Sequence, residues 1–178
     1  MCEQSVLKLA EACREEQFAA MSRIHSLGWR DTYPGYVPDD YLRDVCTEDH
    51  WTAAFQESCE TGNGRGLLLY ADDIPAGCIH FGPARTKNAV GCENYGEIFS
   101  FYMHPDYRGR GYGGRLMDAA LKQLKQDGHD HAFVLVLREN EGARRFYEGC
   151  GFSWDKTVID IPFPHNYICA DLRYVRSI

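Results

Sequence analysis

Four glycines lie within six positions just before an apolar, helix-like run, in the stretch DYRGRGYGGRLM at 106–117. Glycine tolerates positive φ and close backbone approach, so such a loop turns several N–H groups toward one point at a helix start, where the helix dipole also favours an anion. A tight turn alone needs only one or two glycines, and it would not explain why Arg108, Arg110 and Arg115 cluster here. The stretch therefore predicts a site for a phosphate or pyrophosphate.

Two well-known phosphate loops fit this stretch poorly. From Gly109 to Gly114 the sequence satisfies G-x-G-x-x-G, but HPDYR separates the glycines from the strand before them. A dinucleotide site also needs an acidic residue about 20 positions further on, where this chain has Val134 in an apolar run. A P-loop needs Lys and Ser or Thr where Arg115 and Leu116 stand. A dinucleotide-dependent oxidoreductase is thus a remote alternative, and a P-loop is excluded.

Composition narrows the class of protein. The 178 residues, 44% of them hydrophobic, can bury one core, so we interpret 1–178 as a single domain. The net charge of -7 argues against nucleic acid as the main partner. The N-terminus lacks signal-peptide features and no run of about 18 apolar residues occurs, so we expect a cytoplasmic protein without a membrane segment. The eight cysteines show no C-x-x-C pair and no His at zinc spacing, which predicts free thiols and no metal.

Hydrophobic periodicity predicts alternating strands and helices and an α/β (α+β) fold with a mixed sheet. The expected strands are 6–10, a hairpin formed by 67–71 and 75–82, 97–103, 131–137, 154–161 and 167–174. The expected helices are 15–27, 48–59, 113–126 and a short one within 141–151, with a further short helix capped by Asp39 or Asp40.

The chain resembles the GCN5-related N-acetyltransferases over roughly 97–152. Their acetyl-CoA loop reads [Gln/Arg]-x-x-Gly-x-[Gly/Ala], and Arg108, Gly111 and Gly113 match it. The family places an Asn and a Tyr after the next strand, matched here by Asn140 and Tyr147. The resemblance implies a mixed, mostly antiparallel sheet flanked by helices and splayed between its fourth and fifth strands. It also implies acetyl-CoA as the acyl donor, and it does not identify the acceptor.

The resemblance further implies which residues bind acetyl-CoA. Backbone groups of the strand before the loop would pair with the pantetheine arm, and one N–H there could polarise the thioester carbonyl. Asn140 would bind pantetheine, although Asn is also a favoured N-cap and both readings stay open. The full expected set is Phe101, Tyr102, Met103, Arg108, Gly109, Arg110, Gly111, Tyr112, Gly113, Gly114, Asn140, Ala143 and Tyr147.

Tyr147 matches the residue that the family commonly uses as general acid toward the CoA sulfur. Positions 140, 143 and 147 share one helical face, so Tyr147 would point toward the cofactor arm with Asn140 and Ala143. The alternative is a core aromatic beside Phe146 and Phe152.

Glu97 is the expected general base, because it precedes Arg108 by the offset at which the histone-acetylating branch of the family keeps a glutamate. Strand alternation predicts that Glu97 shares a face with Phe99, Phe101 and Met103. The alternatives are an exposed charge at the strand start, His80 or His104 as base, and a water chain.

The acceptor is expected in the segment WRDTYPGYVPDDYL, at Trp29, Asp31 and Tyr33. Further candidates are Arg30, Tyr36, Asp39, Asp40, Phe163, His165 and Tyr167. Aromatic rings beside carboxylates suit a cationic amine, although Trp29 and Tyr33 could instead be core residues. We therefore interpret the chain as an acetyl-CoA-dependent N-acetyltransferase that acts on a small-molecule or peptide primary amine by direct transfer in a ternary complex. A non-catalytic acyl-CoA-sensing or partner-binding module is the alternative, and a homodimer is one option.

Overall fold

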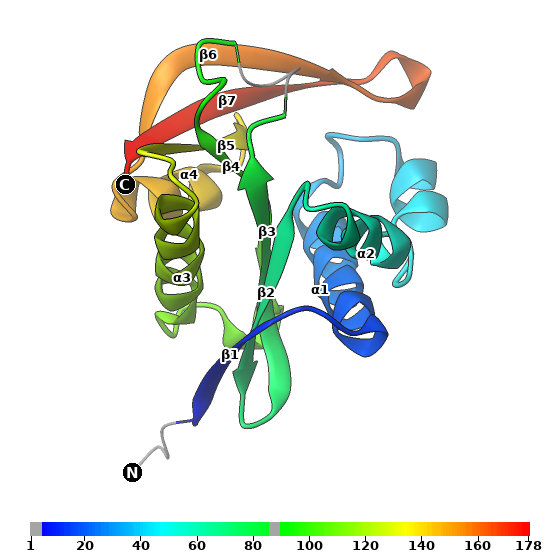
Figure 1. The fold of residues 1–178 in the computed structure, drawn as a ribbon. Helices are drawn as coiled ribbons and strands as arrows, with labels where there is room; N and C mark the ends of the chain where they lie inside the picture. Colours follow the sequence, from blue (N-terminus) through cyan, green and yellow to red (C-terminus); the bar gives the residue numbers. More distant parts are fainter. Residues whose placement is uncertain (1–4, 86–89) are drawn as a thin grey trace.

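One mixed sheet runs through the centre of the protein, whose computed structural model describes residues 5–85 and 90–178 (Figure 1). In the described residues the sheet has seven strands in the order β1-β2-β3-β4-β5-β7-β6. The strands are β1 (Leu7–Glu11), β2 (Arg65–Ala71), β3 (Ile74–Pro83), β4 (Gly96–Met103), β5 (His131–Leu137), β6 (Ser153–Pro162) and β7 (Ile168–Ser177). Neighbouring strands are antiparallel except for the parallel pair β4 and β5. The predicted mixed, mostly antiparallel sheet is confirmed.

The parallel pair is short. β4 and β5 are in register only from Gly96 to Ile98 and from Ala132 to Val134, although both strands continue beyond these residues. The two strands therefore separate toward their carboxyl ends, which confirms the splay that the resemblance implied.

Helices cover both faces of the sheet (Figure 1). On one face lie α1 (Glu15–Thr32) and α2 (Thr52–Glu60), and on the other lie α3 (Tyr112–Gln126) and α4 (Glu141–Gly149). The short helices are η1 (Tyr41–Val45), η3 (Pro105–Tyr107) and η4 (Pro164–Asn166). Leu116, Met117 and Leu124 fill the core under α3, and Phe18, Met21 and Ile24 fill the core under α1. Each helix thus buries the apolar stripe that its periodicity predicted.

Two helix boundaries differ from the prediction. α1 continues past Leu27 to Thr32, because Gly28 does not end the helix but gives room to a neighbour: a Cβ there would lie 2.0 Å from the ring of Tyr102. α2 begins at Thr52, since 48–51 form a turn. The predicted short helix is η1, and the Asp40 side chain caps it by accepting from the Tyr41 N–H at 2.9 Å.

A β-bulge at Phe99 changes which side chains of β4 share a face. The register between β3 and β4 shifts there by one residue. Phe99 packs against His80 on the face that α2 covers, whereas Phe101 and Met103 pack in the core under α3. Glu97 shares the face of Phe99 by alternation. The prediction that Glu97, Phe99, Phe101 and Met103 lie on one face is therefore wrong, because the bulge inserts a residue between the two pairs.

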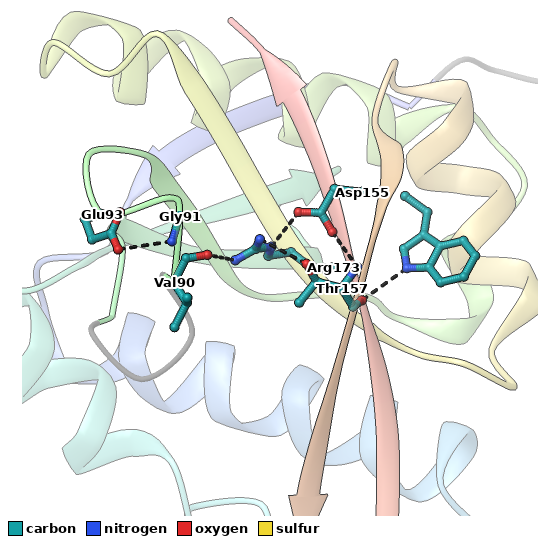
Figure 2. A network of polar contacts seen from close by, with 7 residues as sticks. Val90, Gly91, Glu93, Asp155, Thr157 and Arg173 are labelled. Carbon is teal, nitrogen blue, oxygen red and sulfur yellow. Dashed lines mark hydrogen bonds and ion pairs between the residues drawn. The ribbon is translucent and has the colours of Figure 1, made fainter.

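A buried guanidinium ties the β6–β7 hairpin to the segment before β4 (Figure 2). Arg173, only 6% exposed, donates to Asp155 Oδ2 at 2.7 Å, to Thr157 Oγ1 at 3.0 Å and to the Val90 carbonyl at 2.7 Å. Burial alone would raise the pKa of Asp155, but the hydrogen bonds from Thr157 and Arg173 hold this pKa below its ordinary value. The network fixes β6 and β7 against the strand that begins the splay.

Candidate active site

The glycine-rich loop has the geometry of an anion site. Gly109 and Gly111 have φ of 73° and 77°, and no atom of the described chain lies within 4 Å of a Cβ added at either position. These glycines therefore serve the backbone conformation and not packing. Gly111 is the N-cap of α3 and makes no side-chain capping bond, so the first N–H groups of the helix remain directed out of its end. The loop thus presents backbone N–H donors at the helix start, as the predicted phosphate or pyrophosphate site requires.

Tight packing holds this loop beside the gap between β4 and β5. A Cβ on Gly113 would lie 3.1 Å from the Phe101 ring and 3.2 Å from the Phe146 ring. Phe101 of β4 and Phe146 of α4 stack with their centroids 4.8 Å apart. α3 can approach the splayed strand this closely because Gly113 has no side chain.

A cavity of about 510 Å³, the loop cavity, begins at this loop. It is lined by Thr32, Phe101, Tyr102, Met103, Tyr107, Arg108, Gly109, Gly111, Tyr112, Gly113, Gly114, Asn140, Gly142, Ala143, Phe146 and Tyr147. The structure thus brings together the predicted acetyl-CoA residues apart from Arg110, whose guanidinium lies 5.3 Å over the Tyr107 ring.

A second cavity of about 440 Å³, the aromatic cavity, meets the loop cavity at the splay. The two cavities share Thr32, Phe101, Tyr102, Asn140, Ala143 and Tyr147. The aromatic cavity is lined in addition by the rings of His25, Trp29, Tyr33, Trp51, Phe55, His80, Phe99 and Phe163, together with other side chains. The parting of β4 from β5 therefore brings the loop cavity on one side of the sheet next to the aromatic cavity on the other.

Tyr147 lies at the junction. It is 5% exposed and contacts Phe146 and Phe152 edge-on, so it is a core aromatic residue. It also lines both cavities. Burial is the main cause that raises the pKa of Tyr147, and the neighbouring Tyr33 adds to it. A phenol with a raised pKa keeps its proton at neutral pH and can donate it.

Asn140 caps α4. Its Oδ1 accepts from the Ala143 N–H at 3.0 Å, so the N-cap interpretation holds. Because Asn140 also lines both cavities, capping places its amide beside the splay.

Trp29 and Tyr33 line the aromatic cavity as predicted for an acceptor site. Their rings stack with centroids 4.4 Å apart. The Trp29 indole N–H donates to His25 Nε2 at 2.8 Å, and His25 stacks between Trp51 and Tyr102 at 4.3 and 4.7 Å. Burial lowers the pKa of His25 to about 3, so this ring is neutral and its remaining proton sits on Nδ1.

The structure places Asp31 outside this cavity. Trp29 and Asp31 are two residues apart on α1 and so point to nearly opposite sides of the helix. Asp31 forms an ion pair with Arg108 of the glycine-rich loop. Asp31 therefore lies beside a residue of the loop cavity and lines neither cavity itself.

Glu97 is fully buried and is held by Arg85. Its carboxylate accepts from the Arg85 backbone N–H at 2.8 Å and from the guanidinium at 2.7 and 3.1 Å. Arg85 lines the aromatic cavity, whereas Glu97 is not among the residues that line either cavity. The carboxylate thus positions a cation at the cavity wall.

The two histidines considered as bases differ in position. His80 lines the aromatic cavity, lies 2.9 Å from Ser58 Oγ through Nε2, and has a pKa lowered to about 4 by burial and then by Arg85. His104 Nδ1 accepts from the Asp106 N–H at 3.3 Å and so forms part of the turn that its His-Pro sequence predicted.

Asp171 of β7 was not predicted. It lines the aromatic cavity, and its buried Oδ1 has no hydrogen-bond partner among residues 5–85 and 90–178. Burial, and after it the nearby Glu139, raise the pKa of Asp171 to about 6. The only sequence signal is an acidic residue in a run of strand-like residues, CADLRY, which no local motif distinguishes from a surface position.

The glycine-rich loop at a helix start, the splay between two parallel strands and the buried phenol at that splay lie together around the two cavities. The model of the acetyltransferase (GNAT) family matches residues 8–152, and the chain belongs to this family.

Known relatives agree with this assignment. YuaI, an uncharacterized N-acetyltransferase of Bacillus subtilis (strain 168), is 26% identical over 128 residues, which are 70% of this chain and 69% of YuaI. The PaiA N-acetyltransferase of Thermoplasma acidophilum, solved in complex with coenzyme A, has a TM-score of 0.76 at 18% identity, with 97% of this chain and 99% of that chain covered. The structure of yncA from Salmonella typhimurium contains acetyl-CoA and has a TM-score of 0.73 at 17% identity over 97% of this chain and 94% of that chain. Family and fold are thereby confirmed.

Two negative findings concern the described part of the chain. No helix within it is long and apolar enough to cross a membrane. The same residues contain no group of three or more His, Cys, Asp or Glu side chains that could hold a metal ion.

Proposed function

We propose that this protein transfers an acetyl group from acetyl-CoA to a primary amine, directly and within a ternary complex. The observation that supports this proposal is the meeting of the loop cavity and the aromatic cavity at six shared residues, with Tyr147 in both walls. Such an arrangement lets a donor enter from one side of the sheet and an acceptor from the other. Family membership and the solved relatives with coenzyme A or acetyl-CoA support the identity of the donor.

In this proposal the chain binds the donor mainly through its backbone. The N–H groups at the start of α3 hold the diphosphate, with Arg108 beside it. The β4–β5 ladder ends at Ile98, so the backbone of Phe101, Tyr102 and Met103 faces the splay and can pair with an extended arm. Acetyl-CoA supplies the activated acetyl group as a thioester.

Tyr147 acts as the general acid. Its hydroxyl is protonated at neutral pH, since burial raises a pKa that is ordinarily already near 10, and it lines both cavities. It therefore gives its proton to the leaving thiolate. Glu97, the base expected from the sequence, lines neither cavity. Its carboxylate instead orients Arg85, which lines the aromatic cavity.

The acceptor is a primary amine carried by a small molecule or a peptide. The aromatic rings of the cavity favour a cationic or apolar amine through cation–π and apolar contact.

The cysteines support a reducing, cytoplasmic location, because the thiols of the described residues are free. These are Cys13, Cys46, Cys59, Cys78, Cys92, Cys150 and Cys169, and Cys2 lies outside the described residues.

Calorimetric and thermal-shift titrations with acetyl-CoA and NADH test the donor. We expect binding of acetyl-CoA alone, and a ligand at 100 times its Kd stabilises the native state by about 2.7 kcal/mol. Thiol release with a panel of amines then tests transfer. Binding without transfer to any amine would favour an acyl-CoA-sensing module, and a response to NADH alone would favour the oxidoreductase.

A further inference from the structure

The aromatic cavity contains a carboxylate that the family motifs do not include. We propose that Asp171 binds the ammonium group of the acceptor and takes its proton before the amine attacks. This inference rests on the proposed acetyl transfer and names the proton acceptor of that same site.

The position of Asp171 supports this role. It lies on β7 opposite Leu137 of β5, and Leu137 and Cys169 line the same cavity. Leu172, the next residue of β7, points into the core on the other face of the sheet. Asp171 therefore faces the cavity, at the carboxyl end of β5 where the splay is open.

The oxygen of Asp171 points to a ligand. Its Oδ1 is buried, and within the described residues no donor reaches it. Buried polar atoms in folded proteins are nearly always hydrogen-bonded, because an unpaired buried polar atom costs free energy. No other Asp or Glu in the described part of the chain lines this cavity. A primary ammonium group supplies both a charge of opposite sign and the missing donors.

The surroundings of Asp171 tune its basicity. The titratable groups near it are Glu139 of the segment between β5 and α4, Tyr33 after α1, Tyr147 of α4 and Cys169 on its own strand, with Tyr102, Arg85, His80 and His25 in the same cavity wall. Burial and Glu139 raise the pKa of Asp171 to about 6. The carboxylate is then mostly ionised at pH 7.5, yet it is more basic than an exposed aspartate.

The acceptor enters as R–NH3+, and an oxygen of Asp171 takes one proton and leaves a free amine. The amine nitrogen bonds to the acetyl carbon while the carbon–sulfur bond breaks, and Tyr147 gives its hydroxyl proton to sulfur. The remaining extra proton on nitrogen passes to the Tyr147 oxygen, and Asp171 releases its proton to solvent. One amide, one thiol and one proton are formed.

The direct test is Asp171→Asn, assayed by thiol release with tyramine, spermidine and a peptide that has a free N-terminus. In the wild type, kcat/KM should rise with pH through a limb near pH 6, the pKa of the free enzyme. In Asp171→Asn this limb should disappear and kcat/KM should fall by about 10²-fold or more, while the Kd of acetyl-CoA stays unchanged. A wild-type profile and rate in a folded variant would overturn the inference.

A second variant avoids any change in the cavity. Glu139 is exposed and raises the pKa of Asp171, so Glu139→Gln should shift the limb to lower pH without abolishing it. Glu141→Gln is the matched control, because Glu141 is exposed and pairs with Arg145. If the acidic limb of kcat/KM lies at the same pH in both variants, Asp171 is not the titrating group.

The outcomes separate the two proposals. Absence of acetyl-CoA binding, or of transfer to any amine by the wild type, would overturn the proposed function and remove this inference with it. Transfer by the wild type that depends on Tyr147 and not on Asp171 would keep the function and overturn this inference alone.

Discussion

Trp29 donates its indole N–H to Nε2 of His25 at 2.8 Å, which fixes the tautomer of a histidine whose pKa burial lowers to about 3. His25→Phe should lower the free energy of unfolding by about 1–3 kcal/mol at pH 7.5, because the half-buried indole N–H of Trp29 loses its acceptor. A group with a lowered native pKa stabilises above its unfolded pKa of 6.5, and that contribution is lost as pH falls toward 3. The difference from wild type should therefore shrink at pH 4.5.

Urea unfolding of wild type and His25→Phe at pH 7.5 and pH 4.5 measures this difference in the free energy of unfolding. His50→Gln is the control, since His50 is exposed and contacts only the edge of Trp51 among the rings described. A difference that grows on acidification would contradict a neutral His25.

Tyr147→Phe should keep the Kd of acetyl-CoA and lower kcat by about 10²-fold, because the ring still packs in the core while the proton donor is gone. Calorimetry and steady-state kinetics give the two quantities. Tyr95→Phe is the control, since Tyr95 stacks on His131 away from both cavities. Parallel losses of binding and kcat would assign Tyr147 a packing role.

Gly111→Ala should weaken acetyl-CoA binding by at least tenfold, because a residue with a Cβ resists φ of 77° and the loop must change shape. Gly62→Ala is the matched control: Gly62 has φ of 72° and equally open surroundings in the described residues, but lies between α2 and β2. Both variants should lose similar stability in urea, and only Gly111→Ala should lose affinity. Unchanged affinity would exclude the loop from the donor site.

Asp171→Asn should make the protein more stable than wild type at pH 7.5. A raised native pKa means that the group's stabilising contribution is complete below its unfolded pKa and is lost as pH rises through about 6. At pH 7.5 the wild type then carries a cost of up to about 3 kcal/mol, which asparagine removes. The gain should disappear near pH 4.

Asp155→Asn should change the free energy of unfolding in the opposite direction. The pKa of Asp155 is lowered in the native state, so its contribution is present at neutral pH and is lost as pH falls. This variant should be less stable than wild type at pH 7.5, because it breaks the pair with buried Arg173 (Figure 2). If both variants change stability in the same direction, the assignment of Asp171 as a strained carboxylate is wrong.

Tyr33→Phe should raise the KM of the acceptor, whereas Asp31→Asn should leave it unchanged. Tyr33 lines the aromatic cavity, and Asp31 lies outside it and pairs with Arg108 of the glycine-rich loop. Kinetics with the amine panel compare them at saturating acetyl-CoA. An increased KM in Asp31→Asn alone would move the acceptor site to the loop side.

Short-range patterns together with the family resemblance predicted most of the residues that the structure brings together around the loop cavity. Glycines at 109 and 111, the Asn140 cap and the spacing to Tyr147 act within one turn or one helix, so their pattern survives in one dimension. The hairpin that turns at Asp72 and Asp73 was also predicted from the sequence. Both turn residues adopt positive φ, as a tight hairpin turn requires.

The acceptor side depends on contacts between distant segments. The aromatic cavity joins α1, α2, β4 and the β6–β7 hairpin, and Asp171 gains its properties only when these elements meet. The bulge at Phe99 reversed the face expected for half of β4, and Gly28 looked like a helix end because its neighbour Tyr102 is far away in sequence. No period or motif carries such information.

The three-residue pairing of β4 with β5 also bears on how such a chain can diverge. The donor loop and α4 lie within 104–149, whereas β6 and β7 form a terminal hairpin that pairs with β5 along its whole length. Substitutions within 153–178 that keep Asp171 can therefore reshape the wall of the aromatic cavity while the loop, its glycines and Tyr147 stay as they are. New substrate preferences can arise by remodelling β6 and β7 around that carboxylate, with the donor loop inherited unchanged.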